Sequence, residues 1–95
     1  VFATPSMVAL MENAAMKAVA NDLSEEETTV GGMMNTTHIK PSAIGEEVSA
    51  TAVLVEVEGK KLTFSVEAKD SKGNVIGQGT HIRFIVNRER FLSKL

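Results

Sequence analysis

The chain contains no cysteine, tryptophan or tyrosine, and it has only four phenylalanines and two prolines in 95 residues. Without cysteine it can form no disulfide, use no thiol in catalysis and bind no metal through a thiolate. The charges are mixed along the chain and sum to -2. A basic stripe and an aromatic stacking platform are both absent, so we expect no nucleic-acid partner. The two histidines and the scattered acidic residues also lack metal-ligand spacing, so we expect no metal site.

Long apolar runs are absent as well. No stretch approaches the roughly 20 apolar residues that span a bilayer, and the pattern of a signal peptide is missing. We therefore expect a cytoplasmic protein without membrane contact. Apolar residues make up 43% of the chain and charged residues 23%, which is ordinary for a globular protein. The length suits a single domain over residues 1–95.

The strongest local signal is a helix that begins at Thr4 and runs to about Asn21. A threonine hydroxyl suits the N-cap of a helix, and Pro5 suits the first helical position. The residues that follow are strong helix formers and apolar on most sides of the helix.

Glu12 interrupts this apolar helix. At about 100° per residue it shares a sector with Val8, Ala15, Met16 and Val19. A carboxylate among apolar neighbours costs several kcal/mol unless it is paired or hydrogen-bonded. Glu12 therefore has a partner or a catalytic task, or else its oxygens reach water at the margin of the helix.

From residue 28 onward the β-branched content rises, and we expect strands at 28–39, 46–58, 61–70 and 74–87. Turns are expected at 58–60 and 70–74. The third strand alternates between apolar and polar residues, which predicts one packed face. The second is apolar at nearly every position, which predicts a central place in the sheet. The pattern indicates an α+β fold in which antiparallel strands wrap the helix.

A four-stranded sheet around one helix leaves open edges. Strands of this length commonly continue across a subunit boundary, so we expect a homodimer, which could pair further into a dimer of dimers. The alternative is a monomer whose edge is covered by a segment ahead of the helix.

Four further positions could carry chemistry. His38 ends the first strand just before Lys40-Pro41, where it could meet a ligand or be a solvated loop histidine. Gly31-Gly32 offers backbone N–H groups for an oxyanion, or a β-bulge. His81 lies within the fourth strand, where a packed core histidine is the more common interpretation. With Thr4 and Glu12, the chain has the groups that acyl transfer to water requires.

Several segments resemble the fluoroacetyl-CoA thioesterase-like family of hotdog-fold thioesterases, in the same order and over nearly the whole chain. They are VFATPSMVALME at 1–12, residues 30–38, GKKLTF at 59–64 and IGQGTH at 76–81. The resemblance implies a long central helix wrapped by an antiparallel sheet. The family also has a strand ahead of the helix, which we do not expect in this sequence. The aromatic lid that helps the best-known member select its fluorinated substrate is also absent, so we do not expect that selectivity.

The resemblance implies hydrolysis of a short-chain acyl-CoA to the free acid and CoA. No cofactor is implied, because CoA is part of the substrate. Thr4, Glu12 and His38 match the catalytic group of the family, and Gly31 matches the glycine that positions the thioester carbonyl. We add Gly32 and His81 as candidate substrate-binding residues. The site is expected at a dimer interface.

The residues leave the catalytic roles open. Glu12 could attack the thioester carbon or orient water, and Thr4 could position other groups or attack itself. A non-catalytic acyl-CoA-binding module on the same fold is the main alternative function. A hotdog hydratase would pair an aspartate with a histidine in a sequence motif that we do not find in this chain.

Overall fold

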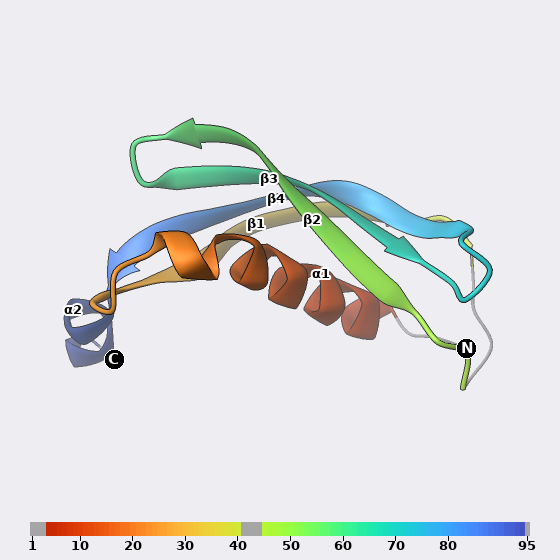
Figure 1. Cartoon of the computed structure of the whole chain (residues 1–95), viewed down its shortest axis with the longest axis horizontal. Helices are drawn as coiled ribbons and strands as arrows, with labels where there is room; N and C mark the ends of the chain where they lie inside the picture. Colours follow the sequence, from red (N-terminus) through yellow and green to blue (C-terminus); the bar gives the residue numbers. More distant parts are fainter. Residues whose placement is uncertain (1–3, 41–44, 95) are drawn as a thin grey trace.

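The computed structural model describes residues 4–40 and 45–94. Within them, α1 (Thr4–Val19) lies along one face of a curved antiparallel sheet (Figure 1). The strands are β1 (Glu27–His38), β2 (Ser49–Glu58), β3 (Lys61–Lys69) and β4 (Val75–Asn87), and the short helices are η1 (Ala20–Asp22) and α2 (Arg88–Ser93). The α+β fold is confirmed. The largest difference from the predicted strand bounds is at the start of β2, which begins at Ser49 rather than at residue 46.

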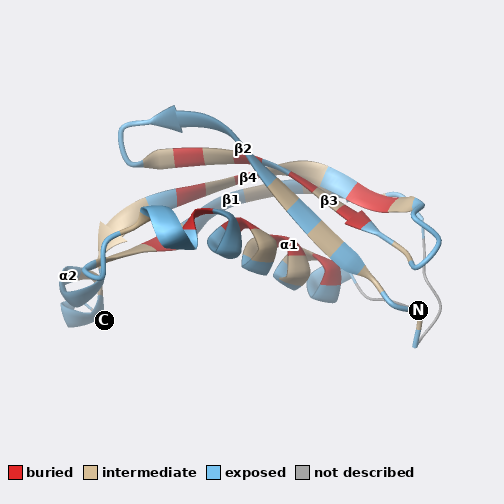
Figure 2. Cartoon of the chain, viewed as in Figure 1, coloured by how far each residue is buried: buried red, intermediate tan, exposed pale blue. Residues whose placement is uncertain are grey.

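The sheet has the order β1-β4-β3-β2, with every neighbouring pair antiparallel. The prediction of a central second strand is therefore wrong, because β2 lies at an edge. Val53, Val55 and Val57 are more than half exposed, at 56%, 59% and 59%, and β2 is largely in the exposed colour in Figure 2. A continuous apolar run is typical of a strand covered on both faces. In this chain only the first part of β2, at Ala50 and Ala52, packs against the core.

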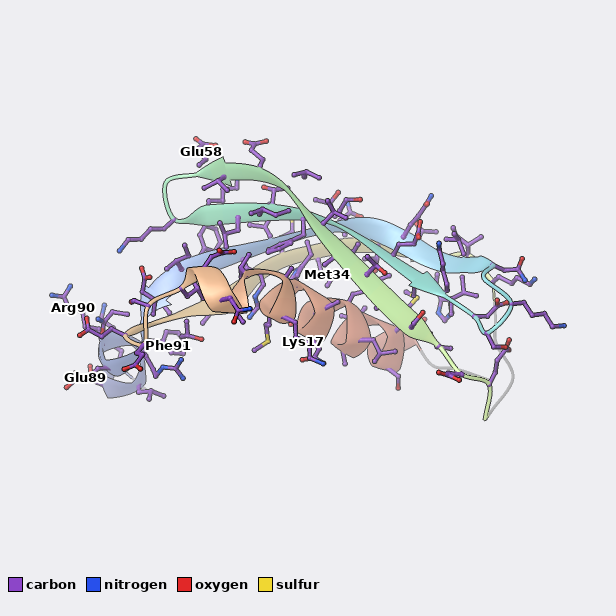
Figure 3. The ribbon with its side chains drawn as sticks, viewed as in Figure 1. Lys17, Met34, Glu58, Glu89, Arg90 and Phe91 are labelled. Carbon is purple, nitrogen blue, oxygen red and sulfur yellow. The ribbon has the colours of Figure 1, made fainter. Side chains whose placement is uncertain are left out.

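The core lies between α1 and the face of the sheet that α1 covers. On α1 a buried residue recurs every four positions, which makes one stripe along the helix. On β3 alternate residues are buried, as predicted from the alternation of the sequence. The buried apolar set is Met7, Met11, Ala15 and Val19 of α1, Leu62, Phe64, Val66 and Ala68 of β3, and Ile76 of β4. Lys17 lies on the opposite side of α1, directed away from the sheet (Figure 3).

Both predicted turns are present. Gly59 joins β2 to β3 with a φ of 59°, and Gly73 lies between β3 and β4 with a φ of 83°, values that favour glycine. In the second turn, the Asp70 carboxylate accepts hydrogen bonds from the backbone N–H groups of Lys72 and Asn74. In the parts of the chain that the structure describes, no helix is both long and apolar enough to cross a membrane.

Candidate active site

The start of α1 lies beside the end of β1, and this brings Thr4 to His38. The Thr4 hydroxyl oxygen and His38 Nδ1 are 2.9 Å apart, a hydrogen-bond distance. Thr4 stands at the start of α1, and its hydroxyl makes this contact. β1 ends at His38 because the next two N–H groups, of Ile39 and Lys40, both donate to the Ile76 carbonyl. Pro41, which was expected to end the strand, lies outside the described residues.

A second cluster forms further along α1, around Glu12. Glu12 Oε2 lies 3.7 Å from Arg83 Nη1, which is an ion-pair distance. The Arg83 side chain is only 5% exposed, whereas that of Glu12 is 44% exposed. The carboxylate therefore has a buried cationic partner on one side and an open face on the other, so it combines the two alternatives that the sequence left open.

Gly31 of β1 lies against this second cluster. A Cβ atom at Gly31 would be 3.5 Å from Glu12 Oε2 and 3.6 Å from both Arg83 Nη1 and His81 Cε1. The absent side chain thus leaves backbone uncovered beside a carboxylate and a guanidinium. Gly32 is the extra residue of a β-bulge, because the register with β4 shifts between Gly31 and Met33.

Arg83 is held in place by three hydrogen bonds. Its Nε–H donates to the Thr29 hydroxyl at 2.8 Å, its Nη2 to the Thr29 carbonyl at 2.9 Å, and its Nη1 to His81 Nε2 at 3.2 Å. Burial lowers the pKa of Arg83, and the nearby Glu12 carboxylate partly opposes that change. A guanidinium stays protonated in proteins. The cluster therefore contains a fixed positive charge that faces Glu12.

His81 is 1% exposed, and its Nδ1 lies 2.7 Å from the Met33 carbonyl oxygen. Because His81 Nε2 contacts Arg83 Nη1, both nitrogens of the His81 ring contact protein atoms. This is the packed core histidine that its mid-strand position suggested. A direct contact between His81 and substrate stays a prediction, as does one with Gly32. A Cβ atom at Gly32 would overlap the ring of Phe84.

The candidate residues thus fall into two groups within one chain. The first group is Thr4 with His38, and the second is Glu12 with Gly31, His81 and Arg83. Thr4 and Glu12 are eight residues apart on α1, which corresponds to about 12 Å along the helix axis. Among residues 4–40 and 45–94, no cluster of acidic and histidine side chains could hold a metal ion.

Arg83 and Thr29 are not among the residues predicted from the sequence. Two signals pointed to Arg83. It is two residues after His81 on the same strand, so both side chains lie on one face of the sheet. An ion pair was also one of the alternatives for Glu12, and in the structure Arg83 is the cation that forms it. No pattern in the amino-acid sequence pointed to Thr29.

Comparison with known proteins finds relatives along the whole chain. The family model described as fluoroacetyl-CoA-specific thioesterase (FlK) matches residues 1–89. The fluoroacetyl-CoA thioesterase of Streptantibioticus cattleyicolor is 40% identical over 95 residues, which are 100% of this chain and 68% of that protein.

Solved structures of relatives have the same fold. A variant of the fluoroacetyl-CoA-specific thioesterase in complex with fluoroacetate and CoA matches with a TM-score of 0.92 at 40% identity, covering 99% of this chain and 73% of that one. A hypothetical protein of Thermus thermophilus, described as a thioesterase superfamily member, matches with a TM-score of 0.94 at 29% identity, covering 99% and 69%. The resemblance found in the sequence is thereby confirmed, and the chain belongs to the fluoroacetyl-CoA-specific thioesterase family of hotdog-fold proteins.

Proposed function

We propose that this chain hydrolyses a short-chain acyl-CoA to the free acid and CoA. The observation that carries the proposal is the 2.9 Å contact between the Thr4 hydroxyl and His38 Nδ1. A hydroxyl bonded to an imidazole is the arrangement in which the ring can accept the hydroxyl proton and so activate a nucleophile. Family membership supports the substrate class, because a relative's structure contains fluoroacetate and CoA.

In the proposed reaction, the Thr4 oxygen attacks the thioester carbonyl carbon while His38 Nδ1 takes the hydroxyl proton. The carbon–sulfur bond breaks, and the CoA sulfur receives that proton from His38. Water then attacks the acyl-threonine ester, with His38 accepting its proton and returning it to Thr4 as the acid leaves. Glu12, whose carboxylate is half exposed, orients this water.

The uncovered backbone at Gly31 provides the place for the carbonyl oxygen. β1 is an edge strand, and the bulge at Gly32 disrupts its regular ladder. Backbone N–H groups there can donate to the developing oxyanion, an effect typically worth about 3–4 kcal/mol. The absence of a side chain at Gly31 permits the close approach that this requires.

We further propose that a homodimer completes each site. The two groups are about 12 Å apart along α1 within one chain, so a single chain cannot direct both at one carbonyl. The free edge of β1 can pair with the same strand of a second copy. An antiparallel pairing centred at Met34 or Asn35 puts Gly31 of one copy beside residues 37–39 of the other. Thr4 and His38 of one copy then face Glu12 and Gly31 of the other.

Substitution of the two central residues tests the proposed activity. Glu12→Gln and His38→Ala are each expected to lower kcat/KM for short acyl-CoA substrates at least a hundredfold, because each removes a group that moves or orients a proton. The release of CoA is followed by a free-thiol assay, and thermal unfolding verifies that both variants are folded. Lys17→Gln, on the far side of α1 (Figure 3), is the matched control and should keep wild-type activity.

Two results would contradict the proposal. Full activity in both variants would remove the assigned residues from the mechanism. Tight binding of acyl-CoA without release of CoA by the wild-type chain would instead support a non-catalytic binding module.

A further inference from the structure

The partners of His81 determine where its proton lies. A carbonyl oxygen can only accept a hydrogen bond, so the 2.7 Å contact with the Met33 carbonyl requires a proton on Nδ1. A guanidinium can only donate, so the 3.2 Å contact with Arg83 Nη1 requires a bare lone pair on Nε2. His81 is therefore a neutral imidazole with its proton on Nδ1.

This imidazole connects two parts of the Glu12 cluster. Through Nδ1 it holds the carbonyl of Met33, which follows the bulge residue Gly32 on β1. Through Nε2 it holds Nη1 of Arg83, the same nitrogen that faces Glu12. The other two donors of Arg83 are fixed by Thr29 on the far side of the guanidinium. The guanidinium is planar and rigid, so the three contacts hold it together, and His81 supplies the one at Nη1, the nitrogen that faces Glu12.

We propose that His81 is a positioning residue, which as a neutral Nδ1-protonated ring directs the Arg83 guanidinium toward Glu12 and Gly31. The inference rests on the proposed function, because it assigns His81 a part in the same site without contact to the substrate. Its effect is on the rate of the chemical step, since a small displacement of a catalytic group lowers the rate strongly.

The surroundings of His81 support this role. The charged groups that face it are Arg83 of β4 and, beyond that, Glu12 of α1. From β3 it meets the apolar ring of Phe64, with ring centroids 6.4 Å apart. A second ring proton would place an N–H against the N–H of Arg83 and push the guanidinium away from its position.

Two variants of His81 each remove one of its two hydrogen bonds and keep the other. In His81→Gln the side-chain oxygen reaches the place of Nε2 and can accept from Arg83, while the bond to Met33 is lost. In His81→Asn the amide nitrogen takes the place of Nδ1 and can donate to Met33, while Arg83 loses its acceptor. Each variant loses one buried hydrogen bond, and thermal unfolding measures what that loss costs in stability.

We expect His81→Asn to lower kcat at least tenfold with KM within threefold of wild type, and His81→Gln to recover most of that loss. Equal losses in the two variants, or a greater loss in His81→Gln, would overturn the proposal in favour of a purely structural role.

Nitrogen NMR of the wild-type protein tests the tautomer without an activity assay. The spectrum should show Nδ1 of His81 protonated and Nε2 unprotonated at neutral pH, and the Nη1 protons of Arg83 should be resolved in wild type and His81→Gln but averaged in His81→Asn. A proton on Nε2, or Arg83 signals that do not differ between the variants, would overturn the proposal. If the wild-type chain released no CoA, the proposed function would fail, whereas these spectra would still decide the positioning of Arg83.

Discussion

At the scale of single residues, the candidate site depends on a glutamate whose cationic partner is 71 positions later in the chain, Glu12 with Arg83. The need for a partner was predictable from the apolar sector around Glu12. The identity of the partner was only indirectly indicated, by the spacing of His81 and Arg83, because the contact itself depends on how α1 lies across β4. The pairing of Thr4 with His38 followed from the family resemblance, and no local pattern specified its distance.

Gly31 provides a test of the space beside Glu12. The methyl group of Gly31→Ala would lie in ordinary contact with its neighbours, at 3.5 Å or more, so we expect the free energy of unfolding to stay within about 1 kcal/mol of wild type. The same methyl would occupy the place proposed for the thioester carbonyl, and kcat/KM should fall at least tenfold. Urea unfolding and the free-thiol assay measure the two quantities. Undiminished activity would exclude a close approach of substrate to Gly31.

Asp70 provides a pH-dependent stabilisation that is independent of the site. Hydrogen bonds from the backbone N–H groups, first that of Asn74 at 2.9 Å, lower the pKa of Asp70. A carboxyl group with a lower pKa in the folded state stabilises the fold above its ordinary pKa of about 3.9. That stabilisation is lost as the pH falls through the folded-state pKa.

We expect an NMR titration of the Asp70 carboxyl carbon to have its midpoint below that of the same residue in the urea-unfolded chain. Asp70→Asn should make stability less dependent on pH in the acidic range. Coinciding midpoints in the folded and unfolded chain would show that the turn does not hold the ionised carboxylate.

At the scale of secondary structure, the helix and the alternating strand β3 were predictable because each shows the period of its own geometry. The place of β2 was not. Its apolar run is compatible with cover on both faces, and strand order depends on long-range pairing that the composition of one strand does not specify. The bulge at Gly32 was predicted only as an alternative, since adjacent glycines fit both a bulge and a binding backbone.

The close approach of β1 and β4 depends on Gly79. A Cβ atom there would overlap the carbonyl oxygen of Asn35 and the backbone of Thr36. Gly79→Ala should therefore lower the free energy of unfolding by about 1–3 kcal/mol, because backbone cannot move aside as a side chain can. Urea unfolding measures the change, with the exposed Ser65→Ala on β3 as control. If Gly79→Ala left stability unchanged, the two strands would have to lie farther apart than in this structure.

At the scale of the whole molecule, the exposed edge of β1 and the separation of the two groups on α1 have one explanation in common. Both follow if the functional unit is a pair of chains joined at β1. The sequence predicted a dimer from open sheet edges, from the length of the strands and from the family resemblance. A further reason to propose one is that the hydroxyl–imidazole pair lies at one end of β1, whereas the carboxylate lies beside Gly31, nearer the middle of the strand.

Mixing two inactive variants is the direct test of a site formed between two chains. When Glu12→Gln and His38→Ala chains are unfolded together and refolded in equal amounts, half of the dimers contain one chain of each kind. One of the two sites in such a dimer has both residues intact, so we expect recovery of about a quarter of wild-type CoA release. Each variant refolded alone serves as the control and should remain inactive. A mixture no more active than the separate variants would show that the site does not form between chains.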